Sequence, residues 1–181
     1  MTRSATSMRA DILDSAARLF AAHGFRGTSL QDIASDVGCS KASLLYHFTN
    51  KDAILSELFA PVGREFDVLL GRLALLTGEE AAKAAVAGVV DLALHFRRQV
   101  KILLLGVDVL LDHPDLPDVD DVTEQLVDAL VGRAPGQTPR VAGWMALLGI
   151  FLTSARGVDI PDETMRAELT SGAFRTLGLS S

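Results

Sequence analysis

Cysteine, proline and long apolar runs are scarce in this sequence of 181 residues. The single cysteine, Cys39, excludes an internal disulfide and leaves no second thiol for a zinc site or a redox pair. The longest apolar stretch, Val100 to Leu111, is interrupted by Lys101 and Asp108 and is shorter than the ~20 residues of a membrane span. The first residues lack the apolar run of a secretion signal, so we expect a cytoplasmic protein without membrane association.

Residues that favour β-strands or break helices are also few. Aromatic residues make up 6% of the chain and prolines number six, whereas 49% of the residues are hydrophobic, mainly Leu, Ala and Val. This balance favours helices and supplies enough apolar surface for a buried core. We therefore expect an all-α fold.

The net charge of −6 is unevenly distributed along the chain. Residues 1–60 carry six basic and six acidic side chains, and the remainder carries eleven basic and seventeen acidic ones. The N-terminal part is thus neutral and the C-terminal part acidic. Overall acidity therefore does not argue against nucleic-acid binding by the N-terminal part.

The spacing of apolar residues predicts about nine helices, at 7–23, 28–37, 40–47, 50–77, 79–98, 100–112, 119–133, 138–156 and 162–177. Gly24 is expected to end the first helix in a left-handed conformation. Thr28 with Gln31 forms a candidate capping box for the second helix, and Ser40 is the candidate N-cap of the third. We expect a three-helix, helix-turn-helix DNA-binding domain at 1–52 and a helical bundle for ligand sensing and dimerisation at 53–181.

The second and third predicted helices have the pattern of a helix-turn-helix. Ala34 is small where the two helices would cross, Gly38 permits a positive φ in the turn, and Leu44 follows six residues later. The third helix then exposes short polar and cationic side chains that suit phosphates and base edges in a major groove. A solvated helical hairpin inside an ordinary bundle is the alternative interpretation.

Residues 9–59 resemble the DNA-binding head of the TetR family of bacterial regulators. The matching segments are Ala16-Ala17-x-x-Phe20, Gly24-Phe25-x-Gly27-Thr28-Ser29-Leu30, Asp32-Ile33-Ala34, Val37-Gly38-x-Ser40-Lys41, Tyr46-His47-Phe48 and Lys51-Asp52-Ala53-Ile54-Leu55. The resemblance implies binding of double-stranded DNA at a palindromic operator. It implies DNA contacts by Thr28, Ser29, Ser40, Lys41, Ser43, Tyr46, His47 and Lys51.

Two positions depart from the family pattern. Many members have an aromatic residue where this chain has Leu45, so we expect Leu45 to pack inward and Tyr46 to take the backbone contact. Lys41 replaces a frequent arginine, which keeps the charge but loses the bidentate fork used on guanine. Lys41 is therefore a candidate phosphate contact.

The predicted helix 138–156 is apolar nearly all round, and with the apolar residues of helix 162–177 this favours a four-helix interface between two copies of the chain. The candidate interface residues are Met145, Leu152, Met165, Leu169, Gly172, Ala173 and Thr176. A two-fold dimer places two recognition helices about 34 Å apart, at successive major grooves of a palindrome. The alternative is that these helices fill a single core.

The resemblance also implies a pocket for a small-molecule effector in each body, although plain core packing explains the same apolar residues. The candidate wall residues are Phe59, Phe66, Phe96, Leu104, Asp108, Trp144, Leu148 and Phe151. Asp108 needs a partner if buried, and Arg97 or Arg98 could supply one without any ligand.

No catalytic motif was found: the chain lacks a nucleophile elbow, a phosphate-binding glycine loop and a His-Glu-x-x-His pair. We expect no enzyme activity, no cofactor and no metal. The sequence indicates a ligand-responsive regulator, most simply a repressor that a small molecule releases from its operator. A helical protein-interaction scaffold without DNA binding is the alternative.

Overall fold

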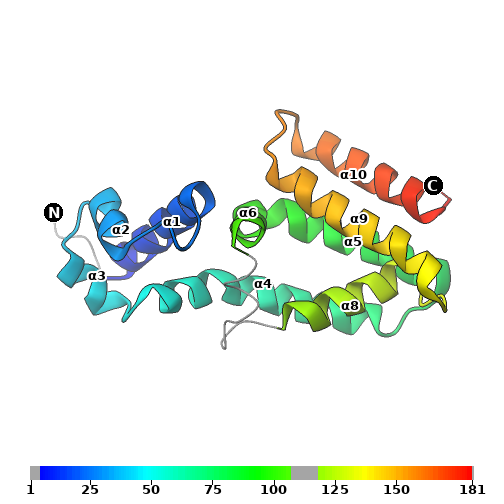
Figure 1. The fold of residues 1–181 in the computed structure, drawn as a ribbon, viewed down its shortest axis with the longest axis horizontal. Coiled ribbons are helices and arrows are strands. Elements are labelled where there is room, and N and C mark those ends of the chain that lie inside the picture. Colours follow the sequence, from blue (N-terminus) through cyan, green and yellow to red (C-terminus); the bar gives the residue numbers. More distant parts are fainter. Residues whose placement is uncertain (1–4, 107–117, 181) are drawn as a thin grey trace.

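The computed structural model describes residues 5–106 and 118–180, and its described part contains only helices and their connections (Figure 1). The helices are α1 (Ala5–His23), α2 (Leu30–Val37), α3 (Lys41–His47), α4 (Lys51–Leu73), α5 (Gly78–His95), α6 (Arg97–Leu105), α8 (Val119–Leu130), α9 (Gln137–Ala155) and α10 (Asp162–Leu177). The predicted all-α fold is confirmed. None of the helices in these ranges is both long and apolar enough to cross a bilayer.

The first three helices gather at one end of an elongated molecule, and α5, α8, α9 and α10 pack at the other (Figure 1). The long helix α4 runs along both parts, and α6 lies between them beside α1. We call residues 5–50 the head and residues 74–180, as far as described, the body.

Two clusters of buried apolar residues correspond to these two ends. One cluster contains Ile12, Phe20, Ile33 and Leu44 and extends to the start of α4. The other joins the second half of α4 to α5, α8, α9 and α10. Ile102 of α6 belongs to the first cluster, so a body helix contributes to the core of the head.

The predicted cap of α2 is wrong by one residue. Ser29, not Thr28, is the N-cap, and Asp32, not Gln31, completes the capping box. Thr28 is 3% exposed, and its Oγ1 donates to the Gly24 carbonyl at 3.0 Å. Two neighbouring hydroxyls could cap the helix, and the burial of the first leaves the second to do so.

The break between α5 and α6 also differs from the prediction. It lies at Phe96, which is 8% exposed, and not at residue 99. The backbone leaves the helical conformation at Phe96, with φ −105° and ψ 33°, and α6 begins at Arg97. The helix α6 ends at Leu105, and the part of the predicted helix 100–112 from residue 107 on lies outside the described residues.

Candidate nucleic-acid interface and internal cavity

The turn between α2 and α3 is fixed by local hydrogen bonds. Gly38 adopts φ 75° and ψ 36°, as predicted, and its N–H donates to carbonyls of the last turn of α2. The Ser40 hydroxyl accepts from the Ser43 N–H at 3.1 Å, which confirms Ser40 as the cap of α3. Leu44, fully buried, holds α3 against the head core. The opposite side of α3 is consequently left to solvent.

The outer side of α3 carries the predicted contact residues. Ser40 and Lys41 are exposed, Ser43 is half-buried, and Tyr46 is 83% exposed. Lys41 forms no ion pair with any residue of the described chain, so its ammonium is available to an anion. Leu45 does not pack inward as expected: 41% of it is exposed, because Leu44 and Phe48 take the two buried positions of this turn.

Ser29 and His47 lie at the edges of this side. The Ser29 N–H donates to the Asp32 carboxylate at 2.8 Å, and the Ser29 hydroxyl caps α2 in return. The Ser29 hydroxyl also donates to the Asp32 carboxylate at 2.7 Å. This hydrogen bond first, and then that of the Ser29 N–H, hold the pKa of Asp32 below its ordinary value. The His47 ring is half-buried and meets the Tyr46 ring edge-on, with centroids 5.3 Å apart.

Lys51 points into the head and not away from it. Its Nζ donates to the carbonyls of Phe25 at 2.5 Å and of Thr28 at 2.8 Å, and lies 4.1 Å from the centre of the Phe25 ring. Partial burial lowers the pKa of this ammonium, and the neighbouring Asp52 opposes that effect. Lys51 and the buried Thr28 therefore both hold the connection between α1 and α2.

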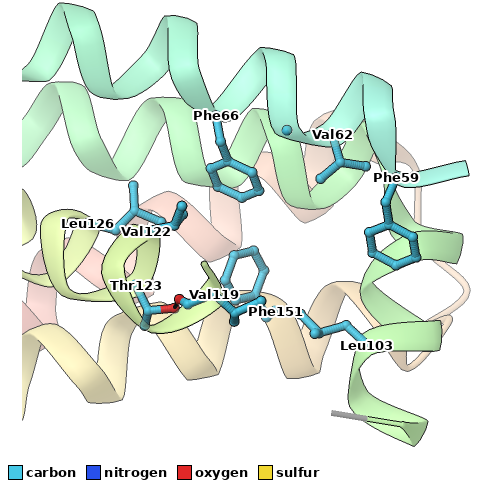
Figure 2. A pocket seen from close by; sticks show the side chains of 10 residues that line it. Phe59, Val62, Phe66, Leu103, Val119, Val122, Thr123, Leu126 and Phe151 are labelled. Atoms are coloured by element: carbon cyan, nitrogen blue, oxygen red, sulfur yellow. Dashed lines mark hydrogen bonds between the residues drawn. The ribbon is translucent and has the colours of Figure 1, made fainter. Parts of the chain in front are cut away.

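A cavity of about 90 Å³ lies where the head and body cores approach each other. Four helices contribute side chains that point toward it: α4, α6, α8 and α9 (Figure 2). Its lining residues are Phe59, Val62, Gly63, Phe66, Leu103, Val119, Val122, Thr123, Leu126 and Phe151. A second space of about 40 Å³ shares five of these residues and adds Leu92, Phe96, Gln99 and Val100. We call the two spaces together the cavity, and each space a lobe.

Four of the predicted wall residues line this cavity: Phe59, Phe66, Phe96 and Phe151. Trp144, Leu104 and Leu148 lie elsewhere. Trp144 borders a polar cleft beside Arg140, while Leu104 and Leu148 are 36% and 45% exposed. Asp108 lies outside the described residues. The arginines considered as its partners bind other carboxylates, Arg97 that of Asp162 and Arg98 that of Asp14.

The predicted interface residues divide between two environments. Met145 and Leu152 are 63% and 46% exposed on α9, on the same face as Val141 and Leu148. Three residues of α10 are instead part of the core of their own chain, because they face α5 and α9: Met165, Leu169 and Ala173. Gly172 and Thr176 are the predicted residues of α10 that reach the surface, the first only in part.

Residues 12–58, which contain this helix-turn-helix, match the family model described as bacterial regulatory proteins, tetR family. The head is thus similar to the DNA-binding segment of TetR-family regulators.

Curated relatives match the same segment. The negative transcriptional regulator IcaR of the biofilm operon icaADBC, from Staphylococcus aureus strain Newman, is 46% identical over 50 residues. That alignment covers 28% of this chain and 27% of IcaR, so the chain matches about a quarter of the length of these relatives.

Solved structures of regulators resemble the whole fold. The ketosteroid transcriptional regulator KstR2 of Mycobacterium tuberculosis superposes with a TM-score of 0.76 at 17% identity, covering 100% of this chain and 97% of KstR2. AibR, solved in complex with isovaleryl coenzyme A and operator DNA, has a TM-score of 0.62 at 23% identity, covering 91% of this chain and 97% of AibR. These likenesses show that the body shares the fold of such regulators.

Two groups that position the head were missed in the sequence. Arg9 donates to both carboxylate oxygens of Glu57 and, at 2.7 Å, to the His47 carbonyl, which ties α1 to α4 and to the end of α3. Its guanidinium lies 4.2 Å from the Phe48 ring centre. A lone arginine in an amphipathic helix gives no sequence signal of such contacts, since surface arginines have the same spacing.

The second missed group is a chain of charges from α2 to α6. Asp36 accepts from Ser15 and from Arg18, both at 2.6 Å. Arg18 also pairs with Asp14, which accepts from Arg98 of α6 at 2.6 Å. The Ser15 hydrogen bond first, and then Arg18, hold the pKa of Asp36 below its ordinary value. The contact between Arg98 and Asp14 thereby links the body to the head across 84 positions of the sequence.

Proposed function

We propose that this protein is a DNA-binding transcriptional regulator that works in the cytoplasm as a homodimer and leaves a palindromic operator when a small molecule occupies the cavity. A repressor is the form we propose, because the related IcaR is a negative regulator. We propose a binding role rather than an enzymatic one.

The observation that carries the proposal is the orientation of α3. Leu44 is fully buried, so α3 is anchored on one side, and Lys41 and Tyr46 project from the other. An exposed cation and hydroxyls on a short helix suit phosphate contacts and major-groove base edges. We include Ser29, Ser40, Ser43 and His47 in this surface. Thr28 and Lys51 support it from inside the head.

Dimerisation through α9 is the second part of the proposal. Val141, Met145, Leu148 and Leu152 follow one another at helical spacing and are all substantially exposed. A row of large apolar side chains along one helix face favours burial against a second copy. A two-fold dimer then presents two α3 helices to two half-sites of a palindrome.

Contacts shared by the cavity and the head support control by a ligand. Leu103 lines both lobes and packs against the head core, and Phe59 does the same from α4. Arg98, five residues before Leu103 on α6, pairs with Asp14 of the head. A ligand that displaces these side chains favours another head position, and a difference in its affinity for the two positions of ~1–3 kcal/mol gives a useful response.

Selection of genomic DNA fragments by the purified protein tests the proposal. We expect a palindrome to be enriched, and its affinity to fall steeply with salt. Lys41→Ala is expected to reduce the slope of log K against log salt by about 0.9, the value of one lost phosphate contact. Lys83→Ala, which removes a lysine of α5 in the body, is the matched control and should leave the slope unchanged. If no fragment is enriched, the protein-interaction scaffold replaces the proposal.

Sedimentation analysis tests the dimer separately. Met145→Asp should convert the dimer to monomers, because it places a charge in the buried centre of the proposed interface. Leu75→Asp, at a residue that is 85% exposed outside α9, is the control and should remain dimeric. A monomeric native protein at micromolar concentration would contradict the interface.

A further inference from the structure

The walls of the cavity are almost entirely hydrocarbon. Among the described residues that line its larger lobe, Thr123 alone has a polar side chain. The Thr123 hydroxyl already donates to the Val119 carbonyl at 2.5 Å, within the same turn of α8. The smaller lobe adds one more polar side chain, the amide of Gln99. No lysine, arginine, histidine, aspartate or glutamate is among the described residues that line either lobe.

Such walls select against a charged ligand. An ion moved from water into this space loses its hydration and finds no opposite charge among the described residues of the lining, which makes its burial strongly unfavourable. An apolar molecule gains from leaving water and from contacts with the three phenylalanine rings, those of Phe59, Phe66 and Phe151. The body as a whole is acidic, but none of the described residues in these walls carries a carboxylate.

We infer that the cavity takes an uncharged, predominantly apolar small molecule, with a single aromatic ring or a branched alkyl group of similar size as the part that is buried. The size follows from the space available. The two lobes measure about 90 and 40 Å³, and together they approach the ~150 Å³ of an engineered apolar cavity that binds benzene. The lobes share five lining residues, so a substituent on the ring can extend from one into the other.

The inference rests on the proposed function, because it concerns the effector site of that regulator. Three probes with a phenyl ring and a branched three-atom substituent test it: isopropylbenzene, benzoate and benzamidinium. They differ mainly in charge, so shape does not decide the outcome. Binding is measured by calorimetry on the full-length protein without DNA.

We expect isopropylbenzene to bind at least roughly 100-fold more tightly than either ion, because the ions meet no compensating charge. Benzoate or benzamidinium binding within about tenfold of isopropylbenzene would overturn the inferred ligand class. Absence of isopropylbenzene binding up to its solubility would overturn it as well.

Substitutions at Val62 locate the binding. Val62 lines both lobes, so Val62→Phe should fill the space and weaken isopropylbenzene binding by roughly tenfold or more. Val62→Ala, which enlarges the space, should preserve binding and thereby keeps the test valid if the larger side chain disturbs folding. Val68→Phe, at a 60% exposed position of the same helix, is the matched control and should bind as the native protein does. Equal binding by Val62→Phe and Val68→Phe would place the probe elsewhere and refute the inference.

The selected operator fragment separates this inference from the proposed function. If isopropylbenzene binds and the operator is retained, the ligand class stands and ligand-controlled release fails. If an ion binds better and releases the operator, release stands and the ligand class fails.

Discussion

Replacing Lys51 by methionine tests whether this residue stabilises the head from inside or contacts DNA. Methionine keeps most of the length and the apolar contact with Phe25, but removes the ammonium. The two hydrogen bonds to the carbonyls of Phe25 and Thr28 are then lost, together with the cation-π contact. Both carbonyls belong to the connection between α1 and α2, so the loss falls on the turn that positions α2 and α3.

The expected cost follows from these contacts. A hydrogen bond to a charged group contributes about 1.5–3 kcal/mol when well shielded, and a cation-π contact at an exposed site adds about 0.5–1 kcal/mol. Lys51 is only half-buried, and water can replace it at the carbonyls. We therefore expect Lys51→Met to lower the free energy of unfolding by about 2 kcal/mol in total, below the sum of the shielded values.

Thermal unfolding followed by circular dichroism measures this effect. For a chain of this size about 2 kcal/mol corresponds to a fall in Tm of about 4–8 °C. Lys41→Met is the matched comparison: Lys41 is exposed, so its change in stability should stay within about 0.5 kcal/mol while operator affinity falls. An unchanged Tm in Lys51→Met, with operator affinity reduced as in Lys41→Met, would refute the internal role and favour a phosphate contact.

Three further substitutions test the turn, the charge chain and the head core. Gly38→Ala should lower stability by about 1 kcal/mol or more in urea unfolding, since Gly38 has φ 75°, and an unchanged midpoint would show that the turn can rearrange. Leu44→Ala should cost about 2–5 kcal/mol because Leu44 is fully buried, and a smaller loss would mean that the head collapses around the gap. The pKa of Asp36 is lowered in the folded state, so its stabilisation is present above pH 3.8, the ordinary value, and is lost as the pH falls through the lower folded value. Asp36→Asn should therefore lower Tm at neutral pH, by an amount that shrinks below pH 3.8. A difference that does not change with pH would show that the carboxylate charge contributes nothing.

The head could be predicted from the sequence in considerable detail. Gly24 and Gly38 end their helices in the left-handed conformation, and Ser40 caps α3, as expected. Each of these features depends on residues within a few positions of one another. Local backbone sterics and local hydrogen bonds are the same in any fold, so the sequence alone determines them.

Features that depend on distant partners were decided only by the tertiary structure. Which of two adjacent hydroxyls caps α2 depends on whether Thr28 is buried under the α1–α2 connection. Lys51, a phosphate contact by resemblance, donates to carbonyls more than twenty residues away. Arg9 reaches Glu57 across 48 positions. The sequence shows that Lys51 and Arg9 are charged, but it does not show which groups they contact in the folded chain.

The body shows the same division. The apolar spacing of α9 and α10 predicted two helices, and both are present. It did not predict that Met165, Leu169 and Ala173 face their own chain while Met145 and Leu152 face solvent. All seven apolar residues predicted for the cavity wall look equivalent in sequence. Four phenylalanines line the cavity, whereas Trp144, Leu104 and Leu148 lie elsewhere. Hydrophobic burial is non-directional, so the sequence determined which residues are apolar and helical, and only the packing of the helices decided which of them leave water and what each one meets.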